Sequence, residues 1–309
     1  MRRAVFFSLL LGALGGLALS GCGRSEGAGP LTDRPTVLRM AHTVNEEEPE
    51  ERKHAYRELG AHMSAKLGMP VEMIEANGYG TAVEALRSGK LDICNSSPMP
   101  YLVAQAKVGV VPLVVPAMPD GTPSTYYSIF ITHPGSGLKT LADIKARAAT
   151  LTFAFADPAS TSGHLIPRAQ LETMGLDAEK DFKRVVFASN HTASVLTVKS
   201  GKVDVAAVTK TLLDRMVRDG RIKAGEVLTL WQSPPMYQSV LYTRKTLDPA
   251  LRARLVDYFV TLAKERPDIW TGMRSQSTSG SVGFTPANDA MFDEFRAIAR
   301  RLEHIRLLD

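Results

Sequence analysis

Short apolar runs alternate with longer amphipathic runs along most of the chain. In the first part of the chain these runs read as strand, helix, strand, helix and strand, over residues 36–43, 46–68, 70–76, 79–90 and 91–94. Gly68 closes the first helix and Gly89 the second, as a glycine does at many helix ends. Repeated strand, helix, strand order of this kind predicts an α/β fold with a parallel sheet.

The same order returns in the second half of the chain. Residues 185–189 (VVFAS) read as a strand, 192–201 (TASVLTVKSG) as a helix and 202–208 (KVDVAAV) as a strand. The segments VEALRSGKLDI and SVLTVKSGKVDV share a Ser-Gly-Lys-apolar-Asp-apolar pattern. Two copies of one α/β unit predict two similar lobes.

Two β-rich runs bounded by turn residues flank this second copy. They are YYSIFIT (126–132) and QSVLYTR (238–244), and we expect both to cross between the lobes. On this assignment lobe one consists of 36–125 plus 245–309, and lobe two of 133–237. Two α/β lobes joined by two crossing strands form a clamshell, in which a ligand binds in the cleft at the carboxyl ends of the strands.

The first residues have the order of a bacterial secretory leader. Arg2 and Arg3 precede a Gly/Ala/Leu-rich run, and the run ends on Leu-Ser-Gly before Cys22, which is typical of a lipoprotein signal over 1–21. We expect acylation of Cys22 and a flexible linker over 22–35, with an ordinary signal peptide as the alternative. No later run approaches the ~20 apolar residues of a membrane helix. The expected location is therefore the periplasm or cell envelope, with a lipid anchor as the membrane attachment.

Composition narrows the possible partners. The chain is 44% hydrophobic and carries a formal net charge of +5, with basic residues spread along it and no Lys/Arg block. Nucleic acid is not expected as a partner. A chain of this size can form one large or two modest cores. We expect a monomer without a cofactor.

The stretch FAFADPASTSGHLIPR (153–168) carries the strongest local signal. A strand leads into Ser160, Thr161 and Ser162, and an apolar run that reads as a helix follows. Hydroxyls and unpaired N–H groups at a helix start favour anions, whereas a plain helix cap would need a single hydroxyl. His191 directly follows strand 185–189, where it is either a donor to an oxyanion, with pH-dependent binding, or a capping or solvent-exposed residue.

Four segments together resemble the phosphonate/phosphite-type family of periplasmic solute-binding proteins, over nearly the whole chain that follows the leader. They are DPASTSGHLIPR, SNHTASVLTVKSGKVDVAAV, YGTAVEALRSGKLDI and SPMPYLVA. The resemblance implies a two-lobed, type II-like clamshell of the periplasmic binding proteins. It implies that the oxyanion is held by Ser160, Thr161, Ser162 and His191. Aromatic residues of lobe one usually complete the pocket of this family, and comparable places are occupied here by Tyr79, Tyr101 and Tyr127.

Cys94 departs from the family pattern. Relatives commonly carry an aromatic or apolar residue and a glycine after this strand, whereas DICNSSP places Cys94, Asn95, Ser96 and Ser97 at the expected cleft. If Cys22 is acylated, the chain has no second cysteine for an intramolecular disulfide. A soft thiolate prefers a soft partner such as trivalent arsenic. A buried cysteine that packs as a small apolar side chain is the alternative.

In this feature the sequence resembles the arsenite-binding periplasmic proteins that serve sensor kinases. That resemblance implies arsenite as the ligand, with Cys94 as the metalloid ligand residue and a sensor histidine kinase as the partner. The alternative is a phosphite-, phosphonate- or phosphate-binding component of an ABC transporter, which would dock on a permease.

Two other functions are weighed against these binding roles. Ser162, His191 and Asp204 can be drawn as the triad of a serine hydrolase, but Ala159 stands where a nucleophile elbow has its first glycine. We therefore expect no enzyme. The histidines show neither H-x-x-x-H nor H-E-x-x-H spacing, so a metal-ion site is not expected apart from the metalloid at Cys94.

Overall fold

The chain is described by a computed structural model, from Thr32 onward. The described residues are 32–44, 49–275, 277 and 279–302. The leader, most of the expected linker and the expected acylation of Cys22 lie outside them. From Thr32 on, the chain forms one compact unit. Within the described ranges, no helix combines the length and the apolarity that a membrane span requires.

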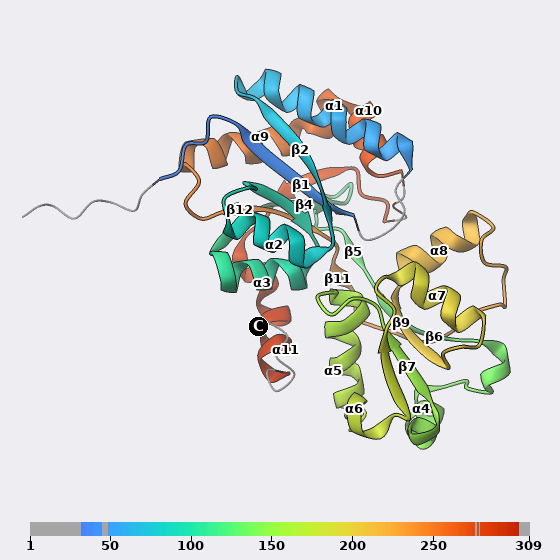
Figure 1. Ribbon diagram of the computed structural model, residues 1–309. Coiled ribbons are helices and arrows are strands. Elements are labelled where there is room, and N and C mark those ends of the chain that lie inside the picture. The colour runs from blue at the N-terminus through green and yellow to red at the C-terminus, as the bar shows by residue number, and fades with distance from the viewer. Residues whose placement is uncertain (1–31, 45–48, 276, 278, 303–309) are drawn as a thin grey trace, which may run out of the picture. The chain divides into compact units, whose positions relative to one another are not determined.

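Six strands form the first sheet, in the order β13-β4-β12-β3-β1-β2 (Figure 1). β1 pairs in parallel with β2 and β3, whereas β12 runs antiparallel to β3 and β4, and β13 antiparallel to β4. The strands are β1 (Leu38–Val44), β2 (Val71–Asn77), β3 (Ile93–Ser96), β4 (Val110–Ala117), β12 (Val240–Arg244) and β13 (Gly283–Pro286). β12 and β13 belong to this sheet although they follow the strands of the second sheet in the sequence.

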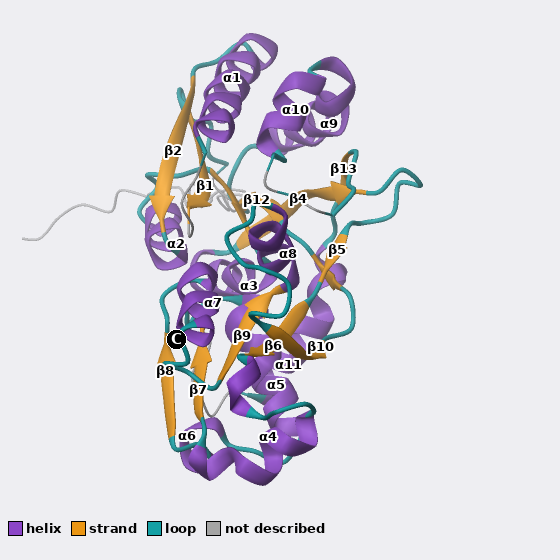
Figure 2. Cartoon of the chain, turned by 90° about the vertical axis from the view of Figure 1, so that its right-hand side faces the viewer, coloured by secondary structure: helices purple, strands orange, loops and turns teal. Residues whose placement is uncertain are grey.

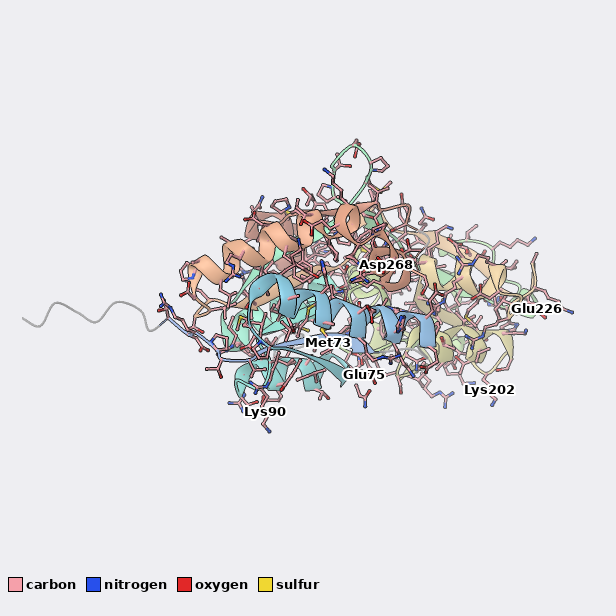
Figure 3. The ribbon with its side chains drawn as sticks, turned by 90° about the horizontal axis from the view of Figure 1, so that it is seen from above. Met73, Glu75, Lys90, Lys202, Glu226 and Asp268 are labelled. Carbon is pink, nitrogen blue, oxygen red and sulfur yellow. The ribbon has the colours of Figure 1, made fainter. Side chains whose placement is uncertain are left out.

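Helices cover both faces of this sheet because its strands alternate their side chains between the faces. On β3, Ile93 belongs to the core under α1, α9 and α10, whereas Cys94 belongs to the core under α2, α3 and α11. The helices are α1 (Glu50–Leu67), α2 (Tyr79–Arg87), α3 (Pro98–Val108), α9 (Pro249–Glu265), α10 (Pro267–Met273) and α11 (Asp293–Arg301), the last preceded by the turn η4 (Asp289–Phe292). Figure 3 shows Met73 beneath α1, where Gly60 makes room for its side chain.

Five strands form the second sheet, in the order β10-β6-β9-β7-β8. β7 is parallel to β8 and β9, and β6 is antiparallel to β9 and β10. The strands are β6 (Ser128–Thr132), β7 (Thr152–Phe155), β8 (Arg184–Phe187), β9 (Val205–Thr209) and β10 (Leu228–Gln232). The helices are α4 (Leu141–Arg147), α5 (Ile166–Thr173), α6 (Ala178–Asp181), α7 (His191–Lys199) and α8 (Lys210–Arg218), with the turns η1 (Pro134–Ser136), η2 (Ala148–Thr150) and η3 (Thr161–Leu165).

The repeated Ser-Gly-Lys unit ends a helix in the same way in both sheets. Gly89 follows α2 with φ of 70°, and Gly201 follows α7 with φ of 69°, a left-handed conformation that glycine adopts without strain. The lysine that follows each glycine projects outward, as Figure 3 shows for Lys90 and Lys202. The sequence repeat therefore corresponds to a structural repeat.

In each sheet, the aspartate of the repeat forms a hydrogen bond to the backbone of a neighbouring strand. The Asp92 carboxylate accepts a hydrogen bond from the Arg39 N–H at 2.8 Å, and the Asp204 carboxylate accepts one from the Thr152 N–H at 2.7 Å. Arg39 lies on the parallel strand next to Asp92, and Thr152 is the first residue of the parallel strand next to Asp204. The shared aspartate is thus explained by strand pairing, without a catalytic role.

A short two-stranded ribbon runs between the two sheets. It pairs β5 (Thr125–Tyr126) with β11 (Met236–Tyr237) in antiparallel fashion (Figures 1 and 2). The sequence predicted crossing strands over 126–132 and 238–244, but β6 lies within the second sheet and β12 within the first. The difference arises because β6 and β12 are as apolar as other central strands, whereas a two-residue ribbon leaves no pattern in the sequence.

Candidate ligand-binding site

The Ser160–Ser162 stretch forms the start of a helix that runs through η3 into α5. Ser160 caps this helix, because its Oγ accepts the Gly163 N–H at 2.9 Å. The backbone N–H groups of Thr161 and Ser162 lie in the first turn, where no intrahelical carbonyl can accept them. All three hydroxyl residues are buried. The helix start therefore offers backbone donors, and the positive end of the helix dipole, to an anion.

Gly163 allows the ring of His191 to lie against this first turn. A Cβ at Gly163 would lie 2.5 Å from Ala156 Cβ, 2.9 Å from His191 Cε1 and 2.9 Å from Ser160 Oγ. Ala156 and Ser160 are buried and well packed, so a side chain at position 163 would displace the third neighbour, His191. The glycine of the Ser-Thr-Ser-Gly sequence is thus required by packing at the site.

His191 is held as a neutral donor. Its Nδ1 accepts the Thr209 N–H at 3.3 Å, so the proton of the neutral ring lies on Nε2, which is 3.4 Å from Ser160 Oγ. Burial lowers the pKa of His191 to about 4. The ring is therefore uncharged near neutral pH. Burial thus moves the titration of the ligand-free ring well below the physiological range, and pH-dependent binding through His191 stays a prediction.

Thr161 joins the helix start to the other lobe. Its Oγ1 accepts the Met99 N–H at 2.7 Å and donates to Ser97 Oγ at 3.1 Å. Met99 lies in the first turn of α3, between Pro98 and Pro100, which have no N–H to donate. The contact brings Ser97, named from the sequence, into the same site as Thr161.

The Tyr126 hydroxyl is a buried donor beside the helix start. Tyr126 is 8% exposed, and no described residue meets hydrogen-bond geometry with its hydroxyl, although the side chains of Ser162 and Thr161 lie close to it. Burial raises the pKa of Tyr126, and the side chains of Ser162 and Thr161 are close enough to oppose that rise. The hydroxyl therefore stays protonated. A buried donor that no described group accepts fits an oxygen of a ligand as its acceptor.

Two further groups complete this environment. Thr209 Oγ1 is buried without a hydrogen-bond partner among the described residues, and the N–H of the same residue holds His191. Tyr79 lies close enough to Tyr126 to act on its pKa.

Tyr126 and Thr209 are not named from the sequence, where the candidate was the adjacent Tyr127. Because successive residues of an extended strand point to opposite sides, Tyr126 and Tyr127 cannot both face the helix start.

A cavity of about 260 Å³ adjoins these groups at Ser97. Four of its lining residues, Tyr79, Asn95, Ser96 and Ser97, are those that the sequence placed at the cleft. Three of them were named as ligand-binding candidates. The structure therefore brings Tyr79, Ser96 and Ser97 to the cavity wall.

Tyr101 lies away from this cavity. It is fully buried, its hydroxyl donates to Asp289 Oδ1 at 2.6 Å, and its ring packs against Phe292 with the centroids 4.7 Å apart. It is therefore a core residue on the inner face of α3. The sequence placed it in the pocket because helix α3 starts at the cleft, but its position on the helix turns it toward α11.

Cys94 is fully buried and does not line the cavity. It is 0% exposed, pairs with Ala41 and Tyr242 in neighbouring strands, and its charged form would raise the pKa of Tyr242 further. The expectation that Cys94 faces the cleft is wrong, because β3 extends further along the chain than the sequence predicted. That strand continues to Ser96, so its carboxyl end lies two residues beyond the thiol.

The hydrolase triad is not assembled. His191 is bonded to Thr209 at the end of β9, whereas Asp204 precedes the start of β9 and accepts the Thr152 N–H. Ser162 and Asp204 therefore do not act on one imidazole. Among the described residues, no group of three or more His, Cys, Asp or Glu side chains is placed to hold a metal ion.

Two α/β sheets, each with helices on both sides and joined by a crossing ribbon beside a polar cavity, define a periplasmic-binding-protein fold. The family model described as "ABC transporter, phosphonate, periplasmic substrate-binding protein" matches residues 43–292. The chain belongs to this family of periplasmic substrate-binding proteins, as the sequence segments predicted.

Named relatives agree with this assignment. The chain is 32% identical over 205 residues to the phosphonates-binding periplasmic protein of Escherichia coli (strain K12), a match that covers 65% of this chain and 59% of that protein. It is 27% identical over 281 residues to the phosphate-import protein PhnD of Mycolicibacterium smegmatis, covering 85% of each. The first match thus spans less than two thirds of its relative.

Solved structures support the fold. A binding protein component of an ABC phosphonate transporter from Pseudomonas aeruginosa superposes with a TM-score of 0.72 at 24% identity, over 86% of each chain. PhnD1 from Prochlorococcus marinus in complex with methylphosphonate gives 0.73 at 18% identity, over 87% of this chain and 99% of that one. Both similarities confirm the two-lobed α/β architecture.

Proposed function

We propose that this protein is the substrate-binding component of an ABC transporter and that it binds a phosphorus oxyanion: a phosphonate, phosphite or phosphate. Family membership supports the class of protein. One observation supports this class of ligand. The Tyr126 hydroxyl is a buried donor with no acceptor among the described residues, and it lies beside the helix start of Thr161 and Ser162.

The donors at this site suit a tetrahedral anion. The N–H groups of Thr161 and Ser162, the Tyr126 hydroxyl and Nε2–H of His191 are all neutral donors, and the helix dipole supplies the favourable potential. A hydrogen bond to a charged group contributes about 1.5–3 kcal/mol. Several such bonds suffice for micromolar or tighter binding, at about −8 kcal/mol.

We propose a permease, rather than a sensor kinase, as the docking partner, because the family model describes an ABC transporter component and one relative is named a phosphate-import protein. We also propose a periplasmic location with a lipid anchor at Cys22, supported by the leader-like sequence. The Cys22→Ser variant should move from the membrane fraction to the soluble periplasmic fraction. Retention of this variant on the membrane would contradict the anchor.

Arsenite is the weaker ligand hypothesis. To bind at Cys94, a metalloid would have to enter a fully buried position beside Tyr242 that lies below the cavity wall. Ser96 and Ser97, which do line the cavity, offer hard oxygen donors instead of a soft one. Cys94 is thus better explained as a small apolar side chain in the core.

Calorimetric titration of the reduced protein with methylphosphonate, phosphite, phosphate and arsenite tests this proposal. At least one phosphorus oxyanion should bind, and Tyr126→Phe, which removes one of the proposed donors, should weaken that binding about ten- to a hundredfold. Tyr101→Phe serves as the matched control, because the Tyr101 hydroxyl donates to Asp289 and lies away from the cavity. Binding of arsenite alone, lost in Cys94→Ser, would overturn the proposal in favour of the metalloid.

A further inference from the structure

Three arginines line the cavity beside the proposed oxyanion site. They are Arg52 from α1, Arg274 from the end of α10 and Arg215 from α8 of the other lobe. Among the described residues that line the cavity, none is Asp or Glu. The cavity therefore combines a positive wall with the polar residues Asn95 and Gln238.

Arg274 is held in this wall by neutral partners. Its Nη2 donates to Gln238 Oε1 at 3.1 Å and to the hydroxyls of Ser277 and Ser279. These partners are all uncharged, and its Nε is buried without an acceptor among the described residues. Burial lowers the pKa of Arg274 to about 10, and the charge of Arg52 adds to this effect. The guanidinium remains charged at neutral pH.

A buried charge without a counterion is costly, and the cost falls when an anion supplies the missing partner. A guanidinium also offers two parallel N–H donors that match a carboxylate or phosphate. The wall around Arg274 therefore suits an anionic group and disfavours an ammonium group.

This positive wall adjoins the oxyanion site at Ser97. Ser97 lines the cavity, and its hydroxyl accepts from Thr161 at 3.1 Å. Helix α8 links the two regions from the other side, since Thr209, which holds His191, immediately precedes it and Arg215 follows on it. A ligand that joins the helix start to the arginines would therefore pass Ser97.

We propose that the arginine wall binds a second anionic group, so that the preferred substrate is a phosphonate with a carboxylate on its carbon chain. This inference rests on the proposed function and specifies its substrate class. The phosphonate group lies at Thr161 and Ser162, and the carboxylate lies against Arg274 and Arg215. An alkylphosphonate offers Arg274 no carboxylate, and an aminoalkylphosphonate places a cation beside it.

Three phosphonates that differ at the far end of one chain test the inference by calorimetric titration: 3-phosphonopropionate, propylphosphonate and 3-aminopropylphosphonate. The carboxylate should bind about tenfold or more tightly than propylphosphonate, and the amine more weakly than both. Arg215→Gln and Arg274→Gln should each lower the ratio of the carboxylate to the propyl affinity. The matched control is Arg218→Gln on α8, whose side chain pairs with Asp219 and is absent from the cavity wall, and it should leave the ratio at the parental value.

The outcomes separate this inference from the proposed function. If the parent binds propylphosphonate and 3-phosphonopropionate equally, the arginine wall does not select an anion, although the phosphorus-oxyanion site stands. If the parent binds no phosphonate, phosphite or phosphate, both fail. Because Arg274 also holds the loop at Ser277, Arg274→Gln is first checked for a cooperative melting transition, and Arg215→Gln decides the test if that variant does not fold.

Discussion

Replacing Tyr126 by phenylalanine should have opposite effects on folding and on binding. The change removes a buried hydroxyl that has no hydrogen-bond partner among the described residues, and such a group costs about 1–3 kcal/mol when unsatisfied. The ligand-free variant should therefore be more stable, by up to about 1 kcal/mol, which raises Tm by about 2–4 °C in a protein of this size. Binding should weaken, because the ligand loses a donor worth about 1.5–3 kcal/mol, or about ten- to a hundredfold in Kd.

The assay pairs thermal unfolding without ligand with calorimetric titration of the best phosphorus oxyanion. The control is Tyr101→Phe, which removes a buried hydroxyl that does have a partner, Asp289, and lies away from the cavity. This control should lose about 1 kcal/mol of stability and keep the parental affinity. Parental affinity in Tyr126→Phe, or a loss of stability with no loss of binding, would refute the assignment of Tyr126 to the ligand.

Three further perturbations have defined outcomes. Gly163→Ala should cost about 1–3 kcal/mol in thermal unfolding and abolish measurable binding, because its Cβ meets Ala156 and His191; parental melting and binding would contradict this packing. Asp204→Ala should cost about 1–3 kcal/mol yet retain affinity in the titration, whereas lost binding in a folded variant would give Asp204 a role at the site. Burial lowers the pKa of His164 and of His191 to about 4, from about 6.5 in the unfolded chain. The unfolded state then binds more protons between these values, so stability is complete above about pH 6.5 and falls toward pH 4, by up to about 3 kcal/mol for each histidine. Denaturant unfolding at several pH values measures this loss, and a flat profile over that range would contradict the burial of both rings.

The sequence predicted the local parts of the fold well. The repeated Ser-Gly-Lys-apolar-Asp pattern is local, because it ends one helix and begins the next strand, so it marks both α/β units. The helix start at Ser160 is also local, since its cap and its free N–H groups lie within four residues. Signals of this kind depend on neighbours in the chain, which the sequence displays directly.

The remaining site residues depend on contacts distant in sequence. Choosing Tyr126 over Tyr127 requires the register of the ribbon, in which Tyr126 pairs with Met236. Placing Cys94 inside the sheet requires knowing that β3 extends beyond it to Ser96 beside β12. Arg274 meets Gln238, which is distant in sequence, and reaches the cavity only because α10 packs in the first lobe.

A crystal structure of the protein with methylphosphonate tests the central claim most directly, because it locates the phosphorus atom. The phosphonate oxygens should lie about 3 Å from the N–H groups of Thr161 and Ser162, from the Tyr126 hydroxyl and from His191 Nε2. A phosphonate bound away from these four donors, with the Tyr126 hydroxyl still lacking an acceptor, would contradict the account.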